Sequence, residues 1–264
     1  MLKQRIITAI AAGLMLLVVL FVLPVPVARL VIGLILLVAA WEWSGLIGQE
    51  SLAGRAVYVA LMAVMLVAAY HYGTDEGTFL LIMEFGLGWW LAALVWTLVY
   101  PTAVPIALRW LCGFLIIVPA WLALDWLYRL NPLFLLLVLT VVWAADIGAY
   151  FTGKRFGRVK LAPQISPGKT WEGVFGGLAG VAVITLVHST WSGINLAVLI
   201  PLCLAVGVVS IVGDLTVSIF KRSAGVKDSG SLFPGHGGVL DRADSITAAA
   251  PLFALGLSWM GAGG

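Results

Sequence analysis

The chain has 264 residues, of which 62% are hydrophobic and only 10% are charged, and its mean hydropathy is +1.10. Soluble domains carry about 25% charged residues, so this composition excludes an ordinary soluble protein. The net charge of +3 is small, and the positions of the charges are more informative than their total. The composition predicts an all-α, polytopic integral membrane protein.

Apolar runs long enough to cross a bilayer, which takes roughly 20 residues, recur along the whole chain. They predict about nine transmembrane helices joined by short turns, at 5–23, 27–46, 55–73, 78–99, 106–126, 132–152, 172–190, 195–213 and 243–261. The first run lacks a small-residue cleavage site, which favours a retained span over a removed signal peptide. We expect about five N-terminal spans in 1–130 and a catalytic transmembrane region in 131–264.

The Lys and Arg residues predict the orientation, because they collect on the cytoplasmic side of a membrane. The segment 153–169 is strongly basic, so we expect it in the cytoplasm. With nine alternating spans, the N-terminus and the polar segment 213–245 fall on the same side. Of the 15 Lys and Arg residues, only Arg29 and Arg129 then lie outside.

Two polar segments, 143–173 and 213–245, interrupt the apolar pattern. The two spans between them are joined by a short outer turn near 189–195, which predicts that both segments lie side by side at the cytoplasmic face. Charges at a membrane boundary are costly and indicate a functional site. Carboxylates suit Mg²⁺, and cations suit phosphate oxygens. The segments therefore predict metal-assisted chemistry on phosphates.

Asp214, Ser218, Lys221 and Arg222 are spaced i, i+4, i+7 and i+8, so a helix would place them on one face, with Val217 at its edge. A boundary helix whose two cations reach lipid headgroups is the plainer interpretation. It explains Asp214 less well, since a carboxylate at the end of an apolar run needs a cation or a metal.

The Gly-rich turn 234–238 would let backbone N–H groups face an anion, and its His236 is a candidate base, phosphate donor or simple turn residue. Asp241 and Asp244 follow at the start of the last span. One of them is explained by helix capping, and both together with Asp214 would serve one or two Mg²⁺ ions.

Asp146 lies inside the sixth span, where function and pairing with Lys154 or Lys169 explain it equally well. The run 166–170, Ser-Pro-Gly-Lys-Thr, precedes a helix and could bind phosphate at the helix N-terminus. It is not a Walker motif, because Pro163 occupies the position of the first glycine. Glu84 has no evident partner.

These motifs resemble those of the phosphatidate cytidylyltransferase (CDP-diacylglycerol synthase) family. The resemblance rests on Ser218-x-Phe220-Lys221-Arg222, Lys227-Asp228-x-Gly230, Pro234-Gly235-His236-Gly237-Gly238 and Asp241-Arg242-x-Asp244. Trp143 to Tyr150 and Ser166 to Trp171 also look like family motifs. One departure is Val217, where bacterial members usually have Glu.

The resemblance implies an Mg²⁺-dependent enzyme of the bacterial inner membrane that joins CTP and phosphatidic acid into CDP-diacylglycerol and pyrophosphate. It also implies a homodimer among membrane lipids, with no nucleic-acid partner. We assign metal binding to Asp214 and Asp241, with Asp146 or Asp244 in support, and catalysis to Asp214, Lys221 and Asp241. The expected nucleotide and phosphate ligands are Lys169, Ser218, Arg222, Lys227, Asp228, His236, Gly237 and Arg242. A second metal or a monovalent cation stays open.

Three alternatives compete with this hypothesis. The first is a related CTP-dependent enzyme acting on another lipid, such as a polyprenol kinase. The second is a relative without activity, because of Val217. The third is an ion-coupled transporter, which the crowding of carboxylates at one face disfavours, since a transporter would spread them near the membrane midplane.

Overall fold

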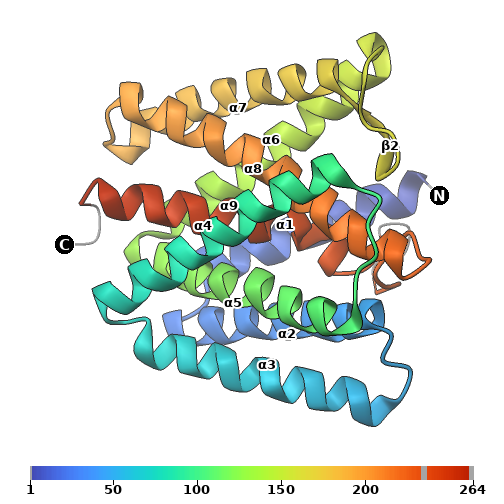
Figure 1. The fold of residues 1–264 in the computed structure, drawn as a ribbon. Helices are drawn as coiled ribbons and strands as arrows, with labels where there is room; N and C mark the ends of the chain where they lie inside the picture. The colour runs from blue at the N-terminus through green and yellow to red at the C-terminus, as the bar shows by residue number, and fades with distance from the viewer. Residues whose placement is uncertain (1, 233–236, 262–264) are drawn as a thin grey trace.

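The computed structural model describes residues 2–232 and 237–261, with side chains from residue 10 onward. Within these ranges, nine α-helices and one β-hairpin follow one another (Figure 1). The elements are α1 (Leu2–Phe21), α2 (Val25–Ile47), α3 (Leu52–Tyr72), α4 (Glu76–Val99), α5 (Ile106–Leu130), α6 (Pro132–Phe156), β1 (Lys160–Ala162), β2 (Ser166–Thr170), α7 (Trp171–Ser192), α8 (Leu196–Ser223) and α9 (Leu240–Trp259). Each helix overlaps one of the predicted apolar ranges over most of its length. The hairpin, which pairs Lys160 with Thr170 and Ala162 with Ser166, was not predicted.

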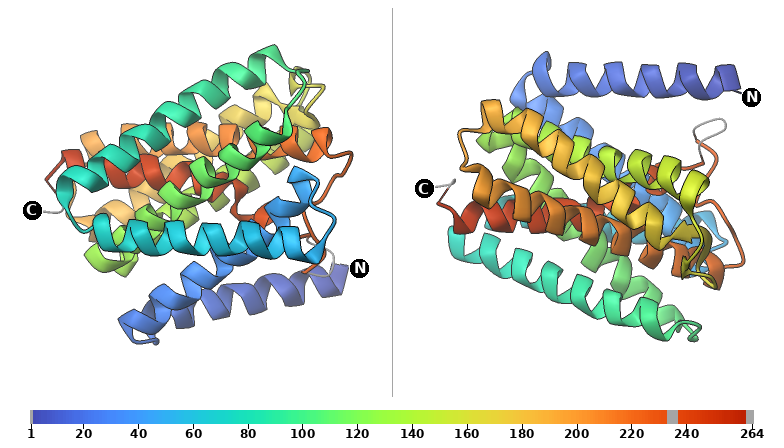
Figure 2. Two further views of the ribbon diagram at one scale, coloured as in Figure 1. Left: turned by 60° about the horizontal axis from the view of Figure 1, so that its bottom comes forward. Right: turned by 90° about the horizontal axis from the view of Figure 1, so that it is seen from above.

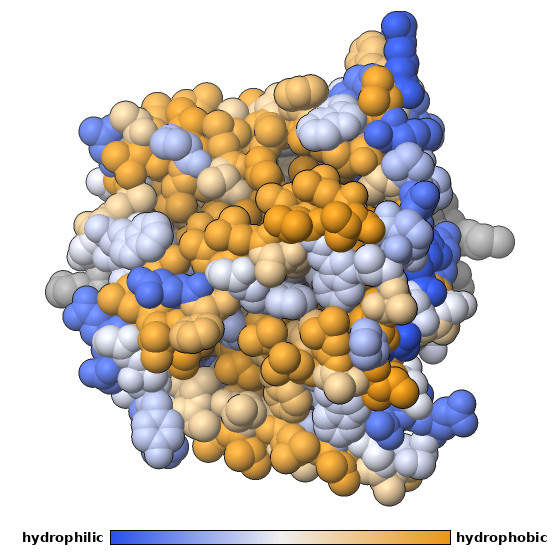
Figure 3. All heavy atoms as spheres, viewed as in Figure 1, coloured by the Kyte–Doolittle hydropathy of each residue, from blue (hydrophilic) through white to orange (hydrophobic). Residues whose placement is uncertain are grey.

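Seven of the described helices, α2 to α8, are long and apolar enough to cross a membrane. In α1, the part with described side chains gives a shorter apolar helix, Ile10–Phe21. Figure 3 shows apolar side chains across the middle of the visible face and hydrophilic ones gathered toward its two ends. The protein is therefore a multi-pass membrane protein, whose apolar belt matches the hydrocarbon layer.

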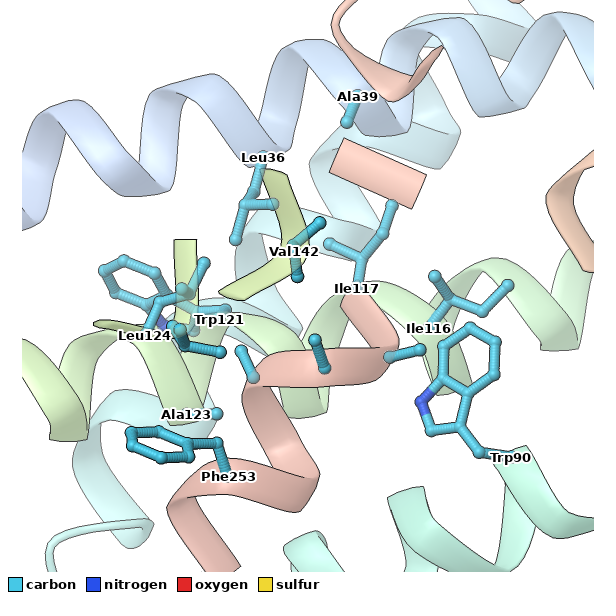
Figure 4. Close-up of a cluster of buried hydrophobic side chains, with 14 of the residues drawn as sticks. Leu36, Ala39, Trp90, Ile116, Ile117, Trp121, Ala123, Leu124, Val142 and Phe253 are labelled. Carbon is cyan, nitrogen blue, oxygen red and sulfur yellow. The ribbon is translucent and has the colours of Figure 1, made fainter. Parts of the chain in front are cut away.

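The helix α9 lies at the centre of the bundle, in contact with α2, α4, α5, α6 and α8. Its small residues Ala248, Ala249 and Ala250 are completely buried, and Phe253 packs into the same core as Trp90 of α4 and Ile116 of α5 (Figure 4). A helix surrounded by protein needs no apolar surface for lipid. This explains why α9 begins with charged residues and falls outside the set of seven. The helix α1 lies along the outside of the bundle (Figure 2).

Glycines bring α6 and α7 into backbone contact, because their missing side chains let the two helices approach closely. A Cβ on Gly177 would lie 2.7 Å from the carbonyl oxygen of Ala145, and one on Gly180 would lie 2.8 Å from that of Ala144. Both distances are shorter than a van der Waals contact with backbone that cannot move aside. The close packing of α6 against α7 thus fixes the position of the hairpin, which connects these two helices.

We expect Gly177→Val to destabilise the protein by about 1–3 kcal/mol, the range for overpacking a close interface. The melting temperature of the protein in detergent would measure the loss. Gly88→Val on α4 is the matched control, since a Cβ there meets nothing within 4 Å. Equal melting temperatures for the two variants would contradict the close approach of α6 and α7.

At the end of the bundle away from the hairpin, the two cations predicted outside share one carboxylate. Asp125 of α5 is 1% exposed and accepts hydrogen bonds from Arg29 and Arg129. In each bond Oδ2 is 3.0 Å from the donor nitrogen, Nη2 of Arg29 or Nε of Arg129. Buried charges are tolerated when they are paired in this way. Asp125 was not predicted as their common partner.

Candidate active site

The helix α8 continues well past the predicted end of its span at residue 213 and reaches Ser223. The four polar residues at 214, 218, 221 and 222 therefore lie on one helix, as predicted. The hydroxyl of Ser218 donates to Oδ1 of Asp214 at 3.3 Å, one turn away. Val217 is completely buried, and Ser218 and Lys221 beside it on the helix are also buried. A Glu in its place would sit inside the bundle, one turn before Lys221.

The two polar segments meet through an ion pair between β2 and α8. Nζ of Lys169 lies 2.7 Å from Oδ2 of Asp214. Nε of Arg222 donates to the carbonyl oxygen of Ile165, in the hairpin, at 3.3 Å. The predicted convergence of the two segments is therefore present in the structure, and Figure 1 shows β2 at the same end of the bundle as the segment that links α8 to α9.

The run 166–170 precedes a helix, as predicted, since α7 begins at Trp171. These residues form the strand β2, and the hydroxyl of Thr170 accepts a hydrogen bond from the backbone N–H of Gly173 at 3.2 Å. The N-terminus of α7 is thus capped by its own chain, which weakens the case for a phosphate there. Lys169 stays a candidate phosphate ligand, because its side chain is 24% exposed.

A second group of charges surrounds Lys221, which is buried at 8% exposure. Its Nζ lies 2.8 Å from Oδ1 of Asp241 and 3.7 Å from Oδ2 of Asp244. This closeness depends on Gly213, where a Cβ would lie 2.6 Å from the carbonyl oxygen of Asp244. The backbones of α8 and α9 touch at that point, so one buried ammonium serves two carboxylates.

The second oxygen of Asp241 holds the segment between α8 and α9. It accepts hydrogen bonds at 2.9 Å from the backbone N–H groups of Ser229 and Gly238. Gly237 has φ +81°, and a Cβ there would lie 2.6 Å from the same carboxylate. The N–H of Gly238, one of those predicted to face an anion, thus faces a carboxylate of the protein. His236 lies outside the described residues.

Asp146 is exposed in the second half of α6 and interacts electrostatically with Lys169, Asp214 and Arg242. Of the two cations weighed for it, Lys169 is the one beside it, whereas Lys154 contacts the hydroxyl of Tyr150 at 3.5 Å. Asp146 therefore belongs to the Lys169–Asp214 group.

The remaining predicted ligands are more exposed. Arg242 lies at the surface of the first turn of α9. Lys227 and Asp228, beyond the end of α8, are exposed, and neither forms a hydrogen bond or ion pair with the residues that the structure describes. The same holds for Glu84, which is exposed on α4.

Glu42, near the end of α2, is a further buried carboxylate that was not among the predicted site residues. Its oxygens accept hydrogen bonds from the backbone N–H groups of Val239 and Leu240, at the start of α9. The signal that indicated Asp146, a carboxylate inside an apolar run, was equally present for Glu42.

The site can hold Mg²⁺ if the protein supplies only one or two of its ligands. Among residues 10–232 and 237–261, no three His, Cys, Asp or Glu side chains converge on one point. Mg²⁺ needs only one or two carboxylates when waters and substrate phosphates complete its shell. Asp214 is the better placed ligand, because its side chain is 28% exposed. Both oxygens of Asp241 already bind Lys221, Ser229 and Gly238.

A separate pocket lies at the opposite end of the bundle, between the start of α6 and the end of α7. It is lined by Asn131, Leu133, Phe134, Leu137, His188, Trp191 and Ser192. It has no carboxylate, Lys or Arg in its lining, so it lacks the groups that phosphate chemistry needs.

A multi-pass membrane protein whose carboxylates and cations meet at one end of the bundle belongs, by fold and site, to the class of membrane enzymes suited to phosphate chemistry. The chain belongs to the Cytidylyltransferase family, whose profile it matches over residues 3–260. It is 47% identical over 264 residues to a phosphatidate cytidylyltransferase of Pseudomonas aeruginosa, covering 96% of each chain. It is 37% identical to that of Haemophilus influenzae, covering 96% of this chain and 97% of the relative.

Proposed function

We propose that the protein is a CTP:phosphatidate cytidylyltransferase of the bacterial inner membrane. It would convert phosphatidic acid and CTP to CDP-diacylglycerol and pyrophosphate. The proposal includes nine transmembrane helices with the N-terminus and the site in the cytoplasm. Arg29 and Arg129, the two cations expected outside, lie at the far end of the bundle from the hairpin, which supports this orientation. A homodimer, implied by the family resemblance, completes the proposal.

The observation that carries the proposal is the meeting of the ion pair Lys169–Asp214 with the buried group around Lys221. Lys221 interacts electrostatically with Asp214 as well as with Asp241 and Asp244. In the proposed orientation both groups face the cytoplasmic membrane boundary, so a lipid phosphate would reach them from the bilayer and a nucleotide from the water. The two substrates are anions, and neutralising their charge is the main task of such a site.

In the proposed reaction, a phosphate oxygen of phosphatidic acid attacks the α-phosphorus of CTP. The bond from this phosphorus to the bridging oxygen of the β-phosphate breaks, and pyrophosphate leaves with the electron pair. Lys169, Lys221 and Arg222 would hold phosphate oxygens. Bound Mg²⁺, held by Asp214 with Asp146 or Asp244 beside it, would supply further positive charge. The attacking phosphate is already an anion, so no general base is required.

The direct test gives the purified protein Mg²⁺ and CTP labelled at the α-phosphorus, with phosphatidic acid, diacylglycerol or polyprenol as acceptor. We expect label in a lipid only with phosphatidic acid, together with an equal amount of pyrophosphate. Labelled CDP in place of labelled lipid, formed together with phosphorylated polyprenol, would instead establish a lipid kinase and overturn the proposal.

Removal of the divalent metal is expected to stop the transfer. EDTA should lower the rate to background, and added Mg²⁺ should restore it, because the lysines alone do not neutralise both the triphosphate and the lipid phosphate. Full activity in the presence of EDTA would exclude Mg²⁺ from the mechanism.

A further inference from the structure

A carboxylate from the N-terminal half of the chain holds the segment that links α8 to α9 in two places. Glu42 is only 7% exposed. At one end of the segment, the hydroxyl of Ser229 donates to its Oε2 at 2.9 Å. At the other end, the N–H of Val239 donates to Oε1 at 2.9 Å and the N–H of Leu240 donates to Oε2 at 2.8 Å. One buried side chain thus receives three hydrogen bonds from residues about 190 positions away.

Two glycines of the segment make room for this carboxylate. A Cβ on Gly230 would lie 2.5 Å from Oε1 of Glu42, and one on Gly238 would lie 2.3 Å from Oε2. Neither distance is possible for a side chain without movement of the carboxylate. The backbone is therefore folded closely around Glu42, and both glycines belong to the motifs that carry the family resemblance.

Asp241 holds the same segment from the side of the site. Ser229 donates its N–H to Asp241 and its hydroxyl to Glu42. Near the other end, Gly238 donates to Asp241 while the next two residues donate to Glu42. The other oxygen of Asp241 binds Lys221. Glu42 is thus linked to the buried ammonium of Lys221 in two places, through Ser229 and through residues 238–240, which contact both Glu42 and Asp241.

We infer that Glu42 is a positioning residue for nucleotide binding, an inference that rests on the proposed function. It acts through Ser229, Val239 and Leu240, which it holds against α2. It also acts through Asp241, which accepts hydrogen bonds from Ser229 and Gly238 beside these contacts. The segment lies at the polar end of the bundle, where a water-soluble nucleotide arrives. Loss of Glu42 therefore weakens the binding of CTP more than that of the lipid.

The test compares Glu42→Gln and Glu42→Asp with the control Glu50→Gln in the full-length purified protein. Glu50 is exposed just beyond the end of α2. In Glu42→Gln, one acceptor oxygen becomes an NH₂ group that faces N–H donors. We expect the KM for CTP to rise by about tenfold or more, in line with lost hydrogen bonds to a charged group. The KM for phosphatidic acid should stay unchanged, and Glu42→Asp, which keeps the charge, should recover part of the affinity.

Hydrogen exchange gives a readout that does not need catalysis. The backbone amides of Val239 and Leu240 should exchange faster in Glu42→Gln and as in the wild type in Glu50→Gln. An unchanged KM for CTP with unchanged exchange would overturn the inference. So would a lower kcat at constant KM, which indicates only a smaller folded fraction.

A failure of the proposed function can be distinguished from a failure of this inference, because the wild type itself would then not transfer CMP to phosphatidic acid. Equilibrium binding of labelled CTP and the exchange of the two amides would still decide the role of Glu42. If Glu42→Gln does not fold, Glu42→Asp and Ser229→Ala provide the comparison. Wild-type CTP binding and exchange in both would overturn the inference.

Discussion

Asp214→Asn is expected to lower the transfer of CMP to phosphatidic acid by about a hundred- to a thousandfold, the usual effect of losing one electrostatic group in a site. The change removes the negative charge and keeps the shape. The side chain is partly exposed and pairs with Lys169, so the melting temperature should change little. Initial rates at saturating CTP and Mg²⁺, with melting temperatures in the same detergent, measure both effects.

Asp241→Asn is the informative comparison for Asp214→Asn. It should also abolish transfer while the protein still inserts into the membrane. In addition it should lower the melting temperature, because its NH₂ group would meet the N–H donors of Ser229 or Gly238, or the ammonium of Lys221. Wild-type turnover in Asp214→Asn would remove this residue from the proposed metal site. An unchanged melting temperature in Asp241→Asn would contradict its role as an anchor.

Lys221→Met is expected to cause the largest combined loss of stability and activity. Met has a similar length and no charge, so the variant leaves Asp241 and Asp244 buried without their cation. Breaking a buried ion pair by removing one partner costs about 3–5 kcal/mol. Unfolding in detergent measures the stability, and the assay with labelled CTP measures the transfer, which should fall to background.

A second substitution tests this explanation of the Lys221→Met result. Adding Asp244→Asn to Lys221→Met should recover part of the lost stability and none of the activity, because one unpaired carboxylate disappears while the phosphate ligand stays absent. Lys154→Met, an exposed cation at the end of α6, is the control and should behave as the wild type. A stable and active Lys221→Met variant would show that this ammonium holds neither the carboxylates nor a phosphate.

The helices could be predicted closely because the bilayer sets the length of an apolar run and leaves its backbone no partner but itself. The largest difference between a predicted span and its helix is at the end of α8. The span predicted from hydropathy ends at residue 213, and the helix continues to Ser223. A helical backbone needs no apolar side chains once it leaves the hydrocarbon, so hydropathy marks the edge of the membrane and not the end of the helix.

The site could be predicted in part. The short turn between α7 and α8 was enough to bring the two polar segments together, and the ion pair between Lys169 and Asp214 lies where they meet. The hairpin could not be predicted, because Ser-Pro-Gly-Lys-Thr has no alternation of apolar and polar residues that would indicate a strand. The roles assigned to Lys227, Asp228 and Arg242 stay predictions.

The sequence by itself determined which stretches enter the membrane, which end of the bundle is polar, and which family motifs lie there. These properties are local, since they depend on runs of neighbouring side chains and the solvent that each run prefers. The tertiary structure alone decided that Lys221 pairs with two carboxylates and that Asp241 accepts hydrogen bonds from backbone N–H groups. It also decided that Glu42 of α2 accepts hydrogen bonds from the start of α9. Such pairings depend on distances between helices remote in the chain, and no local pattern of residues specifies them.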